Sequence, residues 1–176
     1  MTNAISNEFK KHFDELVKLT LELHKRLNAW KEKGLDLEKR LDVELQQFPT
    51  WRFELMDSCA ATVVGFSKAQ RELHRRYIME TDYYRVVQEA PFYWRIMNKP
   101  EGYAGDAEMM SLIYRNCYEG ETPFGMLLHK DAVEEKACDA ARNRRTFLRE
   151  RIIKMKGGGV ESSVSLLAPL WRSGMC

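Results

Sequence analysis

The sequence predicts an all-α protein: an antiparallel helical bundle with long helices, followed by short helices and a final long helix. Apolar residues recur at alternating spacings of three and four along residues 6–33 and 51–89, which is the period of one buried helix face. Prolines and glycines then gather between residues 91 and 125, where only short helices fit between them. Strand signals are nearly absent, and residues 160–167 are the only weak candidate.

Composition is that of a globular protein and excludes several functional classes. The 176 residues are 44% apolar and 31% charged, with a net charge of +2. So small a surplus gives no general reason to expect binding to nucleic acid or to an anionic membrane. The longest apolar runs are far shorter than a membrane span, and no apolar signal core follows the N-terminus. We therefore expect a cytoplasmic protein that has no membrane span and binds no nucleic acid.

The first long helix, over residues 6–33, carries the clearest pattern. Its heptad-like face consists of Phe9, Phe13, Leu16, Thr20, Leu23, Leu27 and Trp30. Ser6 or Asn7 is a natural N-cap, and Gly34 is a natural stop. This Phe9–Trp30 seam is suited either to packing within the chain or to pairing with a second copy in a homodimer.

Two further helices complete the first segment. The same spacing predicts a shorter second helix that ends before Pro49. Its apolar residues are Leu37, Leu41 and Leu45. A third helix is predicted from about Trp51 to about Glu89, with Asp82 as an alternative start of a new turn. Residues 1–90 are therefore expected to form a helical bundle or hairpin.

Shorter elements follow until the last helix. Asp106 can cap one helix, and Pro123 can begin another. A last long helix is predicted from Ala132 to Lys156, and the glycines at 157–159 end it. The chain then divides into residues 1–90, a helical cap over residues 91–160, and an irregular tail over residues 161–176.

The turn before Asp106 is the first candidate binding site. It combines two glycines, a proline, an aromatic ring and an acid just before a helix. Glycines allow close approach of the backbone, and a helix start offers free N–H groups to an anion or a polar ligand. The candidate residues are Lys99, Gly102, Tyr103, Gly105 and Asp106. The alternative is a structural connection in which Asp106 is an ordinary N-cap.

The second candidate lies in the last helix. Helical spacing places Arg144 and Arg145 among the apolar positions, where a guanidinium needs a carboxylate or another acceptor. Asp106 is the first expected partner, and Glu101 and Glu108 are alternatives. In the other interpretation the aliphatic stems of both arginines lie along the apolar surface, and their guanidinium groups reach solvent.

No catalytic or metal-binding residues are predicted. The four histidines, at positions 12, 24, 74 and 129, lack the spacing of metal ligands. No arrangement of nucleophile and base can be defended. A basic cluster on the third helix, around residues 68–76, is interpreted as a solvated face.

Both candidate sites resemble parts of a known family. The sequence over residues 99–106, the apolar positions of the helix that follows, and the Arg142–Arg145 run are similar to a bacterial family of S-adenosylmethionine-dependent methyltransferases. That family includes proteins linked to 3-hydroxypalmitic acid methyl ester biosynthesis, a quorum-signal pathway. The resemblance covers roughly residues 91–160, and residues 1–90 are similar only in being helical.

The resemblance implies a role for the chain. In the family a helical region precedes a Rossmann-like domain, which opens with a strand and a glycine-containing loop that holds S-adenosylmethionine. Residues 157–166 resemble the approach to that strand, and the chain then departs from the family. We therefore expect a helical region that covers the substrate or cofactor of a methyltransferase, is truncated before the catalytic domain and is inactive alone. The seven candidate residues would then bind cofactor or substrate, although this chain alone would hold no cofactor.

Two explanations of this departure from the family's sequence stay open, and so does one alternative function of the chain. A shifted reading frame over residues 167–173 can encode Gly-Pro-Ala-Val-Glu-Val, which resembles the family's cofactor loop. The tail is therefore either the product of a frameshift or natural. The alternative function is a helical dimerisation or protein-interaction module that uses the Phe9–Trp30 seam.

Overall fold

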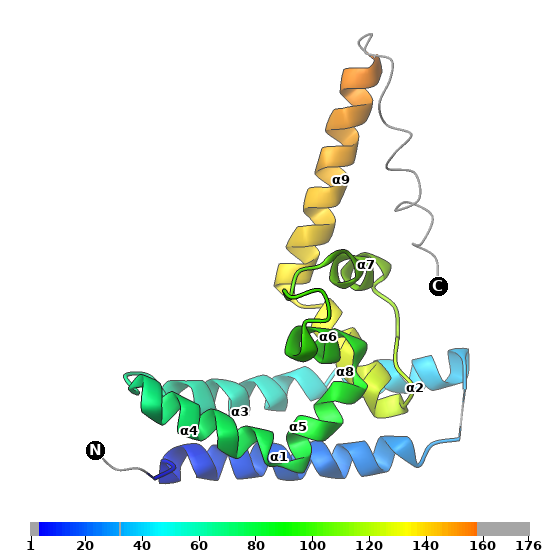
Figure 1. The fold of residues 1–176 in the computed structure, drawn as a ribbon. Helices are drawn as coiled ribbons and strands as arrows, with labels where there is room; N and C mark the ends of the chain where they lie inside the picture. The colour runs from blue at the N-terminus through cyan, green and yellow to red at the C-terminus, as the bar shows by residue number, and fades with distance from the viewer. Residues whose placement is uncertain (1–3, 32, 158–176) are drawn as a thin grey trace.

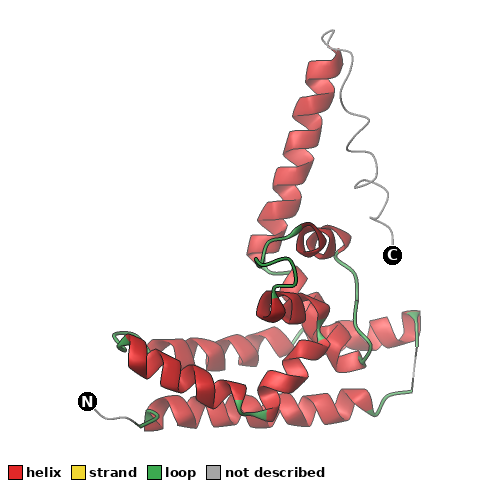
Figure 2. Ribbon diagram, viewed as in Figure 1, coloured by secondary structure: helices red, strands yellow, loops and turns green. Residues whose placement is uncertain are grey.

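The computed structural model describes residues 4–31 and 33–157, and Figure 2 shows that these residues form helices joined by loops, without a β-strand. The helices are α1 (Asn7–Asn28), α2 (Leu35–Leu45), α3 (Phe48–Thr62), α4 (Lys68–Met79), α5 (Asp82–Val86), the 3₁₀ helix η1 (Val87–Glu89), α6 (Pro91–Asn98), α7 (Ala107–Arg115), α8 (Pro123–Val133) and α9 (Lys136–Gly157). The predicted all-α class is confirmed. The predicted tail and weak strand lie outside the described residues.

Helix α1 begins where the sequence predicts and ends earlier. The Ser6 Oγ accepts a hydrogen bond from the Phe9 N–H at 3.3 Å, so Ser6 is the N-cap. The helix ends at Asn28, and the prediction that it runs to Gly34 is wrong. The Asn28 side chain accepts a hydrogen bond from the Phe124 N–H at 3.0 Å, which ties this end of α1 to the start of α8. Gly34, at φ +59°, instead precedes α2.

The predicted seam of α1 is buried inside the chain. Its buried residues are Phe9, Phe13, Leu16, Thr20, Leu23 and Leu27. Helix α1 packs against α3, α5 and α8, and Figure 1 shows α1 and α3 side by side. The face that the sequence offered to a second copy is therefore covered by the chain's own helices. A homodimer through the Phe9–Trp30 seam would have to displace them.

The predicted single helix from Trp51 to Glu89 is wrong, because the chain reverses direction after α3. Gly65, at φ +84°, adopts a backbone conformation that a helix interior does not contain. Ser67 then begins α4 with a capping box: its N–H donates to the Gln70 Oε1 at 3.0 Å, and its Oγ accepts from the Gln70 N–H at 3.3 Å. The alternative break is present, since α5 begins at Asp82.

Three apolar clusters hold the helices together. The largest consists of Leu23, Leu27, Leu37, Leu41, Phe48, Val86, Val87, Ala90, Phe124, Leu127 and Leu128. Helix α8 therefore lies within the core that α1, α2, α3 and η1 form, although its sequence follows the proline- and glycine-rich stretch. A second cluster joins α1 to α3, and a third, of Met109, Ile113 and Cys138, joins α7 to α9. Within the described residues no helix is long and apolar enough to cross a membrane.

A buried ion pair joins α3 to α8. The Arg52 guanidinium contacts the Asp131 carboxylate, and their side chains are only 4% and 3% exposed. Arg52 also donates to the Tyr93 Oη at 3.3 Å, and its guanidinium carbon lies 4.4 Å from the centre of the Phe53 ring. Because a buried charge without a partner is costly, each member of this pair depends on the other.

We expect removal of either partner to be strongly destabilising. Arg52→Met should lower the free energy of unfolding by about 3–5 kcal/mol, because it leaves the buried Asp131 carboxylate without its cation. Asp131→Ala should lower it by less, because Glu135, whose Oε1 lies 3.7 Å from the Arg52 Nη2, still accompanies the arginine. The double variant should lose less free energy of unfolding than the sum of the losses in the two single variants. Urea denaturation measures all three values. The matched control is Arg85→Ala, which removes the exposed Arg85–Asp82 pair and should cost at most about 1 kcal/mol.

His129 of α8 is a second polar side chain in the core. It is fully buried, and its Nδ1 accepts a hydrogen bond from the Phe92 N–H at 3.3 Å. Its Nε2 has no hydrogen-bond partner among the described residues. Burial lowers the pKa of the imidazole from 6.5 to about 4, so the folded protein holds it neutral with its proton on Nε2.

This lowered pKa predicts a loss of stability in acid. Between pH 6.5 and about 4 the unfolded chain binds a proton at His129 and the folded chain does not, so the contribution of His129 to the free energy of unfolding falls as pH decreases. The full effect is about 3 kcal/mol. His129→Asn keeps an acceptor for the Phe92 N–H and does not titrate. Denaturation at pH 7 and pH 4 should therefore show a smaller acid loss for His129→Asn, and equal losses would contradict the assignment.

Candidate functional site

The predicted turn over residues 99–106 connects α6 to α7 at the surface. Lys99 ends α6 in the left-handed conformation at φ +46°, and its carbonyl accepts a hydrogen bond from the Gly102 N–H at 2.8 Å. Gly102 is at φ +83°, so glycine is required there for its backbone freedom. The Tyr103 ring is 56% exposed and passes close to Gly105. Most of the turn is thus a surface loop with a tyrosine on its outside.

Asp106, the last residue of the turn, is the exception, because it is only 2% exposed and its carboxylate accepts hydrogen bonds from within the chain. Its carboxylate accepts the Met109 N–H at 2.8 Å, which confirms it as the N-cap of α7. The Arg95 Nε lies 2.6 and 2.8 Å from the two carboxylate oxygens. The Arg95 guanidinium, helped by the helix N–H groups, holds the pKa of Asp106 below its usual value.

The predicted partnership of Asp106 with Arg144 or Arg145 is therefore wrong. Arg95, on the helix just before the turn, occupies the carboxylate. Glu108, one of the alternatives, pairs with Arg115, whose Nη2 lies 3.0 Å from its Oε1. Arg144 is exposed, as the second interpretation of the arginines expected. The spacing of residues along the sequence does not identify Arg95 as the partner of Asp106, because the two residues lie on either side of a turn.

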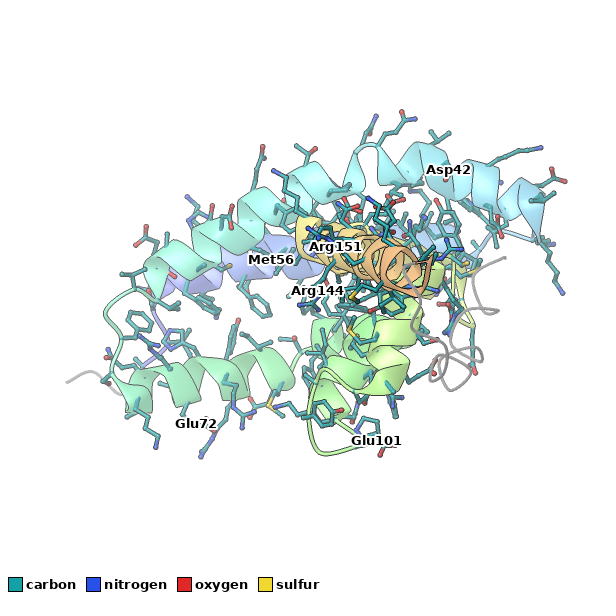
Figure 3. All side chains as sticks on the ribbon, turned by 90° about the horizontal axis from the view of Figure 1, so that it is seen from above. Asp42, Met56, Glu72, Glu101, Arg144 and Arg151 are labelled. Atoms are coloured by element: carbon teal, nitrogen blue, oxygen red, sulfur yellow. The ribbon has the colours of Figure 1, made fainter. Side chains whose placement is uncertain are left out.

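Figure 3 looks down α9 and separates the candidate residues in space. Arg144 and Arg151 lie on the same side of α9, and Glu101 lies in the loop at the outer edge of the molecule, apart from both. The structure thus gathers the five candidates of residues 99–106 in one turn but does not bring Arg144 to them.

Arg142, which the sequence analysis did not single out as a site residue, fixes the base of α9. Its Nη1 donates to the Ile113 carbonyl at 3.0 Å and to the Val133 carbonyl at 2.7 Å. Its Nη2 contacts the Asp139 carboxylate. These carbonyls lie in the last turns of α7 and α8, so one guanidinium satisfies both helix ends and attaches them to α9.

A small pocket opens between α7 and α9, next to Arg142. Its lining residues are Tyr114, Arg142, Arg145, Thr146 and Arg149. The pocket, of about 320 Å³, is called the arginine pocket below. The Arg145 guanidinium carbon lies 4.6 Å from the centre of the Tyr114 ring, a cation–π contact that restricts the arginine. Guanidinium groups only donate hydrogen bonds, so this lining suits an oxyanion.

The outer part of α9 projects away from the body of the molecule (Figure 1). Its apolar side chains are unusually exposed for their size: Phe147 is 55%, Leu148 51%, Ile153 52% and Met155 63% exposed. Helix α9 also carries eight basic and two acidic residues. The whole chain has 28 basic and 26 acidic residues, so the rest of the chain has more acidic residues than basic ones.

Comparisons with known proteins identify no relative: no family model, no curated protein and no solved structure matches the chain. Within residues 4–31 and 33–157, no group of three or more His, Cys, Asp or Glu residues is placed to hold a metal ion.

Loss of the Asp106 carboxylate should destabilise the protein. Asp106→Ala removes both the cap of α7 and the partner of Arg95, so the thermal unfolding midpoint should fall by roughly 3 °C or more. Asp106→Asn keeps an acceptor for the Met109 N–H and should lose less. Arg144→Ala, on the exposed side of α9, should leave the midpoint unchanged. Equal midpoints for Asp106→Ala and the wild type would contradict the pairing and favour a ligand role for Asp106.

Proposed function

We propose that this chain is the helical region of a S-adenosylmethionine-dependent methyltransferase, and that it covers the cofactor or substrate of a separate catalytic domain. The chain would have no methyl-transfer activity alone. The resemblance of the turn at residues 99–106 and of the Arg142–Arg145 run supports the family. The exposed surface of α9 supports the covering role, and it is the observation that carries the proposal.

Helix α9 has the composition of a docking surface. On a helical wheel Phe147, Leu148 and Met155 share one face with Arg144 and Arg151, because their positions differ by three, four or seven residues. Aromatic residues, methionine and arginine are enriched at protein interfaces, and a large exposed apolar patch is uncommon on a monomer. The two ends of the described α9 differ accordingly: the first turns pack on α7, and the outer turns present this face.

The proposal predicts binding to a methyltransferase domain through this face. The chain should associate with the isolated catalytic domain of a methyltransferase of the family that it resembles. Replacing Phe147 and Leu148 by Glu should weaken the association at least about tenfold, since both are large apolar anchors. Calorimetry measures the affinities.

The matched control is Val64→Glu, at the α3–α4 turn. Val64 is 80% exposed and belongs to the turn between α3 and α4, which Figure 1 shows at the left end of the body, away from α9, so this variant should bind like the wild type. A chain that fails to associate with the domain would contradict the proposal. Tight binding of S-adenosylmethionine by the chain alone would contradict the claim that its cofactor core lies elsewhere.

The second candidate, a helical interaction module, rests on the same surface. The Phe9–Trp30 seam is buried within the chain, so we assign self-association to the exposed apolar face of α9 instead. Sedimentation at micromolar concentration separates the two functions. Self-association that the Phe147 and Leu148 replacements abolish would favour the interaction module, and a monomer that binds the methyltransferase domain would favour the first function.

A further inference from the structure

We propose that a pocket formed by η1, α6 and the connection between α7 and α8 binds an organic ammonium group carried by a small soluble ligand. The pocket, of about 440 Å³, is called the tryptophan pocket below, and its volume is within the range of small-molecule sites. Its lining includes Gln88, Glu89, Trp94, Gly120, Glu121 and Thr122. No residue of α9 or of the turn at 99–106 lines it, so the site does not depend on the proposed methyltransferase function.

The first argument is a carboxylate that the chain holds in one place. The Glu89 side chain is 28% exposed. Its Oε1 lies 2.7 Å from the His24 Nε2, and its Oε2 accepts a hydrogen bond from the Thr122 Oγ at 2.5 Å. Each carboxylate oxygen can accept more than one hydrogen bond, so these contacts orient Glu89 without using all of its acceptor capacity. A ligand therefore spends little free energy on ordering this side chain.

The second argument is an exposed aromatic ring beside that carboxylate. Trp94 of α6 is 44% exposed and lines the pocket. Its carbonyl accepts a hydrogen bond from the Asn98 Nδ2 at 2.8 Å, and the same Nδ2 donates to the Gln88 Oε1 at 3.1 Å. These bonds join the last turn of α6 to η1. Tryptophan attracts an organic cation more strongly than any other aromatic residue, so its ring can contact both the charge and the carbon groups of an ammonium ligand.

The third argument is the charge of the lining. Glu89 and Glu121 line the pocket, and no arginine or lysine does. Glu121 is exposed, and among the described residues no basic side chain pairs with it. His24, which contacts Glu89, belongs to α1 and does not line the pocket. Two carboxylates around a hollow attract a cation and repel an anion, so the lining favours an ammonium group.

The fourth argument is that close backbone contacts fix the walls. A Cβ at Gly125 would lie 2.5 Å from the Glu89 carbonyl oxygen, so the start of α8 lies directly against η1. A Cβ at Gly120, where φ is +149°, would lie 2.9 Å from the Met126 backbone nitrogen. Both positions therefore require glycine. The connection that carries Glu121 is held against these elements, so the pocket is formed before a ligand binds.

The test is a titration of the full chain with butylammonium chloride, followed by NMR of the Gly120 and Glu121 backbone N–H signals. Sodium chloride keeps the ionic strength constant. We expect saturable shifts with butylammonium and none with 1-butanol, which has the same carbon chain and no charge. Glu89→Gln and Glu121→Gln should each weaken binding at least about threefold, because each removes a negative charge from the lining. Trp94→Leu should weaken it by a similar factor through loss of the cation–π contact, and Trp94→Phe by less.

The matched control is Glu54→Gln, which removes the same charge from α3. Glu54 is exposed and does not line the pocket, so this variant should bind like the wild type. Equal weakening by Glu54→Gln and the two pocket Gln variants would overturn the site, because binding would then follow only the net charge of the protein. Equal shifts with 1-butanol, or the absence of saturation with butylammonium, would also overturn it. Circular dichroism verifies that each variant keeps its helices, and the exposed Glu121 supplies the comparison if Glu89→Gln does not fold.

Discussion

The Arg52–Asp131 ion pair is the constraint on which the rest of the structure depends. It fixes α8 against α3 inside the apolar core, and Arg52 also bonds to Tyr93 of α6. Burial raises the pKa of Asp131 to about 6, and the Arg52 charge opposes this shift. A shift of α3 along α8 would separate two charges whose side chains are almost fully buried, so the pair sets the register of these helices.

The position of α8 determines where α9 and its pocket lie. Helix α9 starts just after α8, and Arg142 bonds to the carbonyl groups at the ends of both α8 and α7. At the other end of α7, Arg95 holds the capping carboxylate of Asp106. Two arginines from different helices therefore fix α7 at its two ends. The predicted turn thus has a clear structural role: it orients α7, which supplies Tyr114 to the arginine pocket.

Local sequence patterns predicted the helices and their caps better than they predicted which side chains pair with each other. The period of α1 identified its buried face, because a helix that covers a core must repeat its apolar residues. The Asp106 cap was also predictable, since a cap acts within its own turn. The reversal at Gly65 was missed because the apolar period continues across it. The choice of Arg95 over Arg145 as the partner of Asp106, and of Asp131 for Arg52, depends on how distant segments pack, which no spacing along the chain encodes.

The faces of α9 argue that it is more than a solvated helix. One face anchors it through Cys138 and Arg142 and, further along, carries Arg145 and Arg149, and another face exposes Phe147 and Leu148. Isolated helices owe little stability to propensity alone, so the outer turns of α9 gain most from contacts beyond the chain's own core.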